Sequence, residues 1–534
     1  MRLSPRWTAF SAFTVAFAVL AAFVFWGTWS LDVAPVMPDH AITHPADSAA
    51  RWFRGWLATG KFFPGDVIDL TGMPYFWQEF KYALFDYFAA LALAWFLLGR
   101  GLARPAAYGA GLLLGFSGYW LTLFSAGHFG WFQWMSCGVF AFGLADRAVR
   151  VGRLRHWLLL GAVVAWAGFN QQDLWLLFTC FTAFYFFWCC WRERRFPWKG
   201  MLIAATAFLL ISLPNFTGIG AIVASRQQQI TQSSAVQNAA GQKTANKADA
   251  ASSASERWEF VTNWSMPPED TLEFLVPGVH GDTSCPLVLS VGARTGSGVT
   301  PYTGRLGRPM NAPQGNYRQH SLYVGAVTLL FALVGVLAFC LRRSRSDCAF
   351  FAVAALVFYL LSLGRFFEPA YRLVFALPAG DLIRCPVKWH HLTELSLAVL
   401  AAYGIHEVLA RFAAVRWVLP AVVAVVVLGA ADLARVDHRY CAPMNVANAR
   451  RLGYSGQDTV VRRQDFQNPQ VAEMARRGLV VAQANYLGNP DHFLVSVLKP
   501  FGRDERKTDP LAVTLGVVSL LATLGVAALG VKRT

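Results

Sequence analysis

Polar and cationic side chains gather at the ends of long apolar segments of the sequence. His128 lies in one such turn, Asn170 and Gln171 lie in the next, and Arg384 and Lys388 lead into a later apolar run. Cations and hydrogen-bond donors at one mouth suit an anionic ligand such as a phosphate head group. Simpler roles also fit these residues: His128 could cap a helix or lie at the interface, and Arg384 and Lys388 could snorkel to lipid phosphates.

One acidic residue precedes a short aromatic segment and could act as a base. Asp47 and Ser48 are followed by Trp52, Phe53 and Trp56, which have helical spacing. Asp47 or Ser48 would therefore be a natural helix N-cap. Alternatively, the Asp47 carboxylate is held just above a bilayer, where it can deprotonate an acceptor hydroxyl. The residues alone leave both roles open.

Four acids lie within or at the edge of apolar runs: Asp86, Asp173, Glu394 and Asp432. An ionised carboxylate at the bilayer centre is costly, so such residues usually face a cavity or a partner. Asp173 and Asp432 lie near outer helix ends, where they can reach the interface. By helical rise, Asp86 and Glu394 lie roughly one turn inside the outer boundary. For Asp86 and Glu394 two roles remain: lining a functional cavity, or forming a structural ion pair.

Long apolar runs are the elements that must position these residues. A helix needs about 20 apolar residues to cross the hydrocarbon of a membrane. The runs are Thr8–Ser30, Tyr82–Gly99, Ala106–Phe124, Trp131–Ala145, Trp157–Phe169, Leu174–Trp191, Met201–Val223, Leu322–Leu341, Ala349–Leu363, Trp389–His406, Trp417–Leu433 and Leu511–Val531. They predict an all-α membrane protein, a polytopic bundle of about 12 transmembrane helices.

Basic residues cluster in alternate turns between the runs and indicate an orientation. The turns are Arg2/Arg6, Arg100/Arg104, Asp146–His156, Arg192–Lys199, Arg342–Asp347, Glu407–Arg416 and Lys532/Arg533. They hold 19 basic against 4 acidic residues, and so +15 of the formal net charge of +16. By the positive-inside rule, these turns and both termini are cytoplasmic. The basic balance is therefore topological; it predicts contact with membrane lipids and no nucleic-acid partner.

Four long segments lie on the opposite side: Leu31–Lys81, Ser225–His320, Gly364–Lys388 and Arg435–Asp509. They divide the chain into three parts. The first is a transmembrane domain over 1–434, which contains a first outer loop at 31–81 and a large outer loop at 225–320. The second is the segment 435–509, and the third is a final helix with a cytoplasmic tail over 510–534. Residues 435–509 alternate short apolar and polar stretches, which predicts a small extracytoplasmic α+β segment. No Gly-rich nucleotide loop occurs in the cytoplasmic turns, which argues against primary ATP-driven pumping. No His/Cys spacing predicts a zinc site.

A set of short motifs occurs in a fixed order along residues 1–410. After Asp47 they are Thr71–Pro74, Ser125–His128, Asn170–Gln172, Thr262–Ser265, Glu269–Gly278, Tyr323–Ala326, Ser362–Arg365 and Ile383–Pro386. In this order they resemble the bacterial YfhO-like family of multi-spanning membrane proteins, within the GT-C type of glycosyltransferases that use lipid-linked sugars. The chain departs from that family at the Asn-Gln-Gln turn, where a His-Pro-Gln-like turn is more common, and over Arg435–Asp509.

The resemblance implies catalysis on the extracytoplasmic face of the bacterial cytoplasmic membrane. The donor would be a polyprenyl-phosphate-linked sugar, and the acceptor a cell-envelope glycan or lipid. Asp47 matches the catalytic base, with Asp39 as second choice, and His128, Arg384 and Lys388 would bind the donor phosphate. This chemistry is coherent, because the leaving phosphate needs cations and the acceptor hydroxyl needs a carboxylate base. Some members of the superfamily use a divalent metal, but no acidic pair here predicts one, and no other cofactor is implied.

Two other functions remain open from the sequence. Polar helix mouths and intramembrane acids also suit a transporter or flippase of a lipid-linked glycan or another amphiphile, with no bond made or broken. A non-catalytic assembly or scaffold role is the third interpretation. A transporter needs comparable polar access from both faces, whereas the long loops here lie on one face. This asymmetry favours glycosyl transfer, with Asn170, Gln171, Asp86 and Glu394 as further substrate-binding residues.

Overall fold

The computed structural model describes most of the helical part of the chain and shorter pieces of its long loops. The described residues are 5–26, 33–36, 48–64, 77–126, 129–169, 172–216, 257–259, 261–262, 264–280, 321–342, 346–377, 380, 383–441, 444–447, 454–462, 480–484, 492–500 and 507–531.

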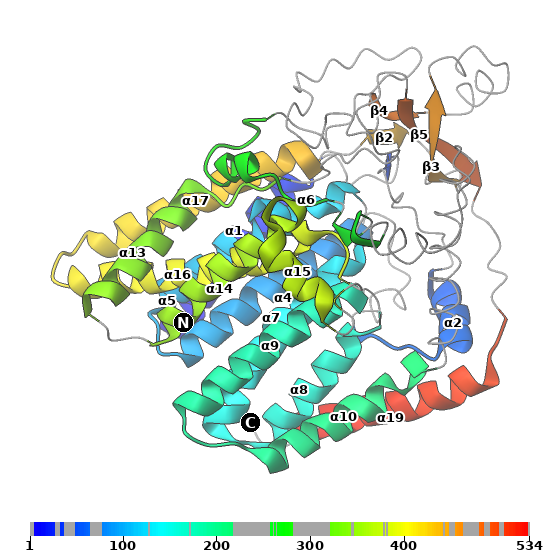
Figure 1. Cartoon of the computed structure of the whole chain (residues 1–534), viewed down its shortest axis with the longest axis horizontal. Coiled ribbons are helices and arrows are strands. Elements are labelled where there is room, and N and C mark those ends of the chain that lie inside the picture. Colours follow the sequence, from blue (N-terminus) through cyan, green and yellow to red (C-terminus); the bar gives the residue numbers. More distant parts are fainter. Residues whose placement is uncertain are drawn as a thin grey trace.

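A helix occupies the position of every predicted apolar run (Figure 1). These helices are α1 (Pro5–Val24), α4 (Trp77–Gly99), α5 (Arg104–Gly115), α6 (Gly118–Ala126), α7 (Phe129–Val151), α8 (Leu154–Ala167), α9 (Gln172–Arg192), α10 (Trp198–Phe216), α13 (Ala326–Arg342), α14 (Ser346–Ser362), α16 (His390–Arg411), α17 (Val418–Cys441) and α19 (Pro510–Val531). Shorter helices are α2 (Ser48–Thr59), η2 (Pro268–Phe274), η4 (Gly364–Phe367), α15 (Glu368–Ala376) and η6 (Pro386–Trp389).

Within the described part, seven helices are long and apolar enough to cross a membrane, or up to nine if each bent pair is one span. This supports a polytopic helical membrane protein, whereas the expected count of about twelve is not shown. α8 and α13 are short, at 14 and 17 residues, and the last turns of α7 carry Asp146, Arg147 and Arg150. α5 and α6 meet at a bend of 45°, and α14 meets the helix Gly364–Ala376 at 112°.

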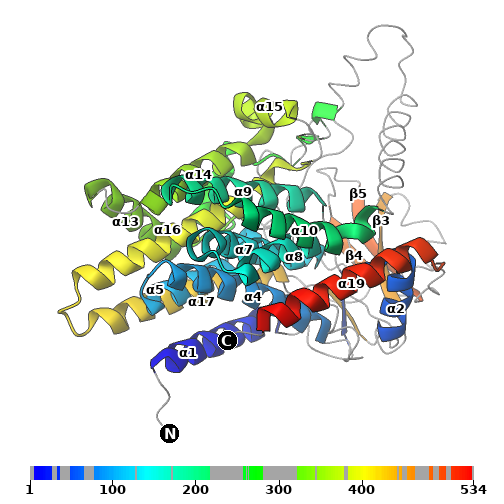
Figure 2. The same cartoon turned by 90° about the horizontal axis from the view of Figure 1, so that it is seen from below.

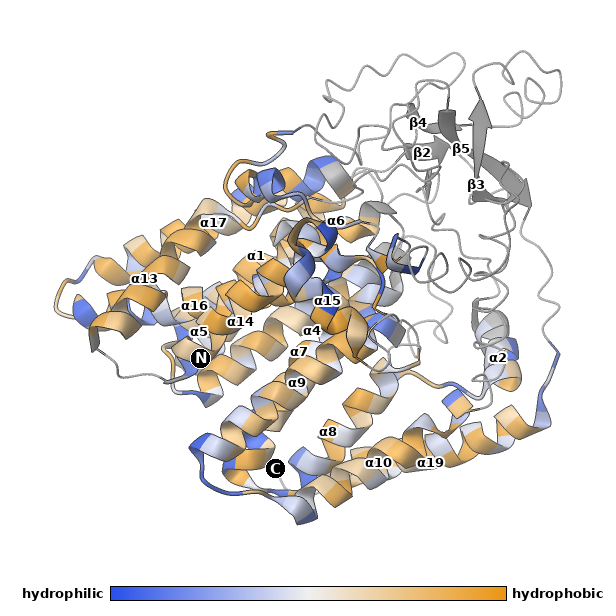
Figure 3. Ribbon diagram, in the orientation of Figure 1, coloured by the Kyte–Doolittle hydropathy of each residue, from blue (hydrophilic) through white to orange (hydrophobic). Residues whose placement is uncertain are grey.

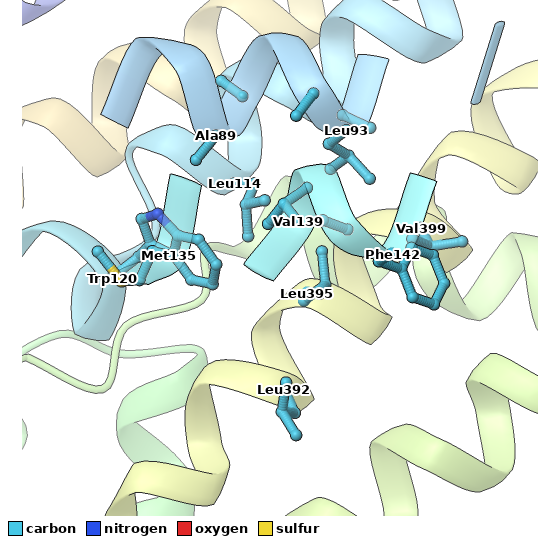
Figure 4. Close-up of a cluster of buried hydrophobic side chains, with 14 of the residues drawn as sticks. Ala89, Leu93, Leu114, Trp120, Met135, Val139, Phe142, Leu392, Leu395 and Val399 are labelled. Carbon is cyan, nitrogen blue, oxygen red and sulfur yellow. The ribbon is translucent and has the colours of Figure 1, made fainter. Parts of the chain in front are cut away.

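α16 is the central helix of the bundle. With the turn before it, it is the most deeply buried of the candidate spans, with 72% of its length inside the protein. It packs against α13, α14 and α5. Figure 4 shows its Leu392, Leu395 and Val399 gathered with Leu114 of α5 and Val139 of α7. Burial of this apolar surface holds the residues at the mouth of α16 in fixed positions.

The helices α8, α10 and α19 form one edge of the bundle. A separate apolar cluster, which includes Ala162, Ile211 and Val526, joins them. Large apolar side chains such as Leu209 and Leu521 are exposed on this edge, and Figure 3 shows that hydrophobic residues predominate along α8, α10 and α19. An extended apolar exterior suits contact with lipid better than contact with water.

The short helix α2 docks on the last helix, α19 (Figure 2). At Gly60, where φ is +66°, an added Cβ would lie 2.0 Å from the Ala512 carbonyl oxygen. An added Cβ at Gly516 would lie 2.6 Å from the Gly60 Cα. The Asp509 amide donates to the Leu57 carbonyl at 3.1 Å. The first outer loop is thus held by backbone-to-backbone contact with the C-terminal end of the chain.

Strands connect the first and last outer segments. β1 (Val33–Val36) pairs antiparallel with β2 (Met444–Ala447), with Val33 opposite Ala447. β3 (Tyr454–Arg462), β5 (His492–Pro500) and β4 (Val480–Ala484) form an antiparallel sheet in the order β3-β5-β4. The described residues after Cys441 and before Lys507 are strands only. The expected α+β character of 435–509 therefore remains a prediction.

Buried ion pairs bring four of the basic turns to one end of the bundle. Asp146 of α7 accepts from Arg150 at 2.6 Å and from Arg100 at 3.4 Å. Asp347 of α14 pairs with Arg100 and with Arg192 of α9. Burial by itself would lower the pKa of Arg100. The nearby acidic groups, of which Asp347 contributes most, together outweigh this effect, so the pKa of Arg100 lies above its usual value. We refer to these five residues as the arginine–aspartate cluster.

Candidate functional site

The structure describes four of the nine predicted site residues. They are Arg384, Lys388, Asp86 and Glu394. Asp39, Asp47, His128, Asn170 and Gln171 lie outside the described residues. The position of Asp47 in the chain, directly before α2, leaves its two predicted roles open.

The turn that carries Arg384 and Lys388 is fixed by main-chain hydrogen bonds to the large outer loop. The Cys385 amide donates to the Val261 carbonyl at 3.0 Å, and the Val387 amide donates to the Trp264 carbonyl at 3.2 Å. Cys385 has φ of +66°, a left-handed conformation that is uncommon for a residue with a side chain. Such a conformation persists only where the surroundings enforce it, and it often marks a functional turn.

Lys388 points into the protein, and its ammonium group pairs with Asp173 at the start of α9. Lys388 is only 5% exposed, and its Nζ lies 4.9 Å from the centre of the Trp131 ring. Asp173 also accepts a hydrogen bond from the Leu174 amide at 2.9 Å. Lys388 therefore does not snorkel to lipid, and Asp173 does not simply reach the interface. The pair instead joins α9 to the turn before α16.

Arg384 is half-buried in the same turn. Its guanidinium carbon lies 5.6 Å from the centre of the Trp264 ring. This separation is within the range of a cation–π contact. The two cations of this turn therefore differ. Lys388 is buried in its pair with Asp173, whereas Arg384 is partly exposed at the mouth.

Glu394 lies deeper, against the break between α5 and α6. Its Oε1 accepts hydrogen bonds from Ser117 Oγ at 2.6 Å and from the Tyr119 amide at 3.1 Å. The carboxyl group thus satisfies donors at the first turn of α6, where the helix dipole favours a negative charge. His390 Nε2 lies 3.7 Å from the same oxygen, one turn earlier on α16.

Two further buried acids lie near this break. An added Cβ at Gly115, the last residue of α5, would lie 3.4 Å from Asp86 Oδ2. Asp437 of α17 is fully buried and lies within electrostatic range of both Asp86 and Glu394. Among the described residues, no lysine or arginine forms an ion pair with any of the three acids. The predicted structural ion pair for Asp86 and Glu394 is therefore not what the described part of the chain shows.

Sequence reasoning missed Asp437 because it assigned residues from 435 onward to an outer segment. α17 instead continues to Cys441. The signal was present, because Leu433, Asp437 and Cys441 repeat at four-residue spacing and all three are buried. That spacing extends the apolar face of the helix past the predicted boundary.

A small apolar cavity lies between the start of α13 and α17. Its volume is about 250 Å³. It is lined by Gly325, Ala326, Val327, Thr328, Val425, Leu428, Gly429 and Asp432. At its rim Asp432 accepts from the Tyr323 hydroxyl and pairs with Arg435 at 2.8 Å. An apolar space with a polar rim suits part of a lipid chain.

Across the described ranges, no three His, Cys, Asp or Glu side chains are arranged so that they could hold a metal ion. No family model, no curated protein and no solved structure matches the chain.

Proposed function

We propose that the chain is a multi-pass membrane glycosyltransferase that transfers a sugar from a polyprenyl-phosphate-linked donor to an extracytoplasmic glycan or lipid acceptor. The observation that carries this function is the rigid turn 383–389, which holds Arg384 half-buried beside Trp264 at the mouth of the central helix. A planar guanidinium suits a phosphate, because it can donate two parallel hydrogen bonds.

The two predicted cations of this turn have different roles. Lys388 and Asp173 neutralise each other and position the turn against α9. Arg384 is then the residue that stabilises the phosphate as it leaves the sugar, since charge develops there in the transition state. His128, Asn170 and Gln171 supply further hydrogen bonds to the donor.

The acceptor hydroxyl needs a base, and Asp47 takes this role, with Asp39 in reserve. Support comes from the docking of α2, the helix that follows Asp47, on α19, and from the β1–β2 pairing on the other side of Asp47 in the chain. Both contacts restrict the first outer loop. The apolar cavity between α13 and α17 accommodates part of the lipid chain of the donor.

The same function sets the place of the chain in the cell. All twelve apolar runs cross the bacterial cytoplasmic membrane, including those of the short helices α8 and α13. Both termini are cytoplasmic, the active face is extracytoplasmic, and the segment between α17 and α19 forms a small α+β unit on that face. The charge asymmetry of the turns supports this orientation.

A direct test is release of polyprenyl phosphate by the purified protein from a panel of lipid-linked sugars. We expect Arg384→Ala to lower this release by about 100-fold, the typical effect of removing one group that stabilises transition-state charge. The matched control is Arg372→Ala, since Arg372 is an exposed arginine that also lies over a tryptophan. Release at the wild-type rate in Arg384→Ala would reject Arg384 as the phosphate ligand.

A second prediction concerns the base. Asp47→Asn keeps the shape and much of the capping ability of the side chain but removes the proton acceptor. Turnover should fall at least about 100-fold if Asp47 is the base, whereas loss of a helix cap alone would cost at most about 1 kcal/mol of stability and leave turnover nearly intact. Thermal stability and turnover measured on one preparation separate the two roles, and wild-type turnover would move the base to Asp39.

One observation favours a second function, a transporter or flippase of a lipid-linked glycan or another amphiphile. Three acids, Asp86, Glu394 and Asp437, are buried around the α5–α6 break, and among the described residues none of them pairs with a lysine or arginine. Broken helices and intramembrane acids are typical of transporters. Movement of labelled donor across a vesicle membrane without release of polyprenyl phosphate would support this alternative.

A further inference from the structure

Three carboxyl groups from three different helices surround the α5–α6 break. Asp86 comes from α4, Glu394 from α16 and Asp437 from α17. All three are buried, and Asp437 lies within electrostatic range of the other two. The break itself exposes the main chain of α6, which Glu394 partly satisfies through Ser117 and Tyr119.

The surroundings contain little positive charge to balance these acids. In the described part of the chain, the titratable side chains on the elements around them include Tyr119 of α6, Cys385 before η6, His390 and His391 of α16, His438 of α17, and Asp270 and Glu273 of η2. Nδ1 of His438 lies 3.1 Å from the carbonyl oxygen of Val24 in α1. Lys388 is held by Asp173, and Lys81, earlier on α4, lies 5.8 Å from the Phe85 ring centre.

Three ionised carboxylates in this place would be strongly unfavourable. Each buried, unpaired charge costs several kcal/mol, and neighbouring like charges raise that cost. The oxygens Asp86 Oδ1 and Glu394 Oε2 and both oxygens of Asp437 have no hydrogen-bond partner in the described structure. A protonated carboxyl removes the charge and adds a donor, and two nearby acids can share one proton. Proton binding would therefore remove the unfavourable charge from this group of acids.

A buried histidine lies beside this group of acids. His390 is 0% exposed, and neither ring nitrogen has a hydrogen-bond partner among the described residues. Its Nε2 lies 3.7 Å from Glu394 Oε1, and its ring packs 4.5 Å from the centre of the Phe274 ring. His390 directly follows η6, which carries Lys388 at the mouth. An imidazole can accept a proton on one nitrogen and release one from the other.

We propose that Asp86, Glu394 and Asp437 form a proton-binding site around the α5–α6 break, with His390 as the proton carrier between this site and the mouth at Lys388. In each transfer His390 Nε2 gives its proton to the Glu394 carboxylate, and Nδ1 takes one from a hydronium ion on the side of the mouth, which becomes water. The proton of the imidazole is then on Nδ1, and a flip of the ring brings it back to the Glu394 side before the next transfer. One proton moves, and the imidazole ends neutral. The site stands apart from glycosyl transfer, because neither the phosphate cation nor the base belongs to it.

Protonation has a consequence for the break itself. The ionised Glu394 carboxylate is a strong acceptor for Ser117 Oγ and the Tyr119 amide. A proton on Glu394 weakens both hydrogen bonds, so the first turn of α6 is held less firmly by α16. Proton occupancy thus controls the stability of the break.

Infrared difference spectroscopy on the full chain in lipid nanodiscs tests the site. The carbonyl stretch of protonated carboxylic acids is recorded at neutral pH and after a jump to alkaline pH. We expect a protonated-carboxyl band that Asp86→Asn, Glu394→Gln and Asp437→Asn each reduce and that the triple variant removes. Glu368→Gln, at an exposed acid of α15, is the control and should leave the band unchanged.

The carrier role has its own readout. His390→Gln should keep the band but slow its hydrogen–deuterium exchange by about 100-fold, the lower end of the contribution of a positioned proton-transfer group. An unchanged exchange rate would reject His390 as the carrier. If the triple variant does not fold, as judged by thermal unfolding, the three single variants decide, since one that folds and leaves the band intact excludes its acid. Absence of the band at neutral pH, or its displacement by sodium ions at constant pH, would overturn the proton site.

Discussion

At the residue scale, the Lys388–Asp173 pair gives a sharp prediction. Removing one partner of a buried ion pair leaves an uncompensated charge, so Lys388→Met should lower the free energy of unfolding by about 3–5 kcal/mol. The double variant Lys388→Met/Asp173→Leu should recover most of that loss, because no buried charge is left. Chemical denaturation of the four proteins of this cycle measures the coupling.

The exposed pair Arg372–Glu368 on α15 is the matched control. Exposed pairs contribute about 0–1 kcal/mol, so the same cycle there should show little coupling. Additive losses at Lys388 and Asp173 would show that the two side chains do not depend on each other.

Sequence alone could place these residues at helix mouths but could not pair them. Lys388 and Asp173 are separated by 215 positions, and nothing local links them. The intramembrane positions of Asp86 and Glu394 were predicted from helical rise, since that depends only on nearby residues. Their grouping with Asp437 depends on the packing of three helices, which a hydropathy pattern does not contain.

At the element scale, the twelve apolar runs correctly predicted where helices occur, but not the break in Ala106–Phe124. No proline marks the break at Phe116 and Ser117. It is stabilised from a distance, by Glu394 and by the Tyr323 carbonyl, which accepts from the Gly118 amide at 2.8 Å. A side chain at Gly118 would collide with that carbonyl. Tertiary hydrogen bonds of this kind override the local preference for a continuous helix.

The docking of α2 on α19 gives the prediction at this scale. Gly516→Ala places a methyl group against Gly60, and overpacking of this kind costs about 1–3 kcal/mol. We expect α2 to detach locally, so that trypsin cleaves after Arg54 faster than in the wild type. Gly525→Ala is the matched control on the same helix, because its added Cβ meets nothing within 4 Å. Equal cleavage in both variants would contradict close contact between α2 and α19.

At the scale of the whole molecule, the arginine–aspartate cluster supports the prediction that successive turns of the chain lie at alternate ends of the bundle. Arg100, Asp146, Arg192 and Asp347 come from four turns that the charge pattern assigned to one side. Their contacts require these turns to share one end of the bundle. The turn before α16 and the start of α9, assigned to the other side, likewise meet through Lys388 and Asp173. The charge pattern thus predicted which turns lie together.

The absolute orientation is the last prediction. Arg153, between α7 and α8, and Glu368, at the start of α15, are both exposed and lie in turns assigned to opposite sides. Each is replaced by cysteine in a background where the exposed Cys340 and also Cys285 are serine. Because basic turns are retained in the cytoplasm, a membrane-impermeant maleimide should label Glu368→Cys in intact cells, and Arg153→Cys only after permeabilisation. The reverse pattern would place Arg384 and the first outer loop in the cytoplasm and exclude an extracytoplasmic acceptor. Labelling of both from outside would contradict the alternation itself.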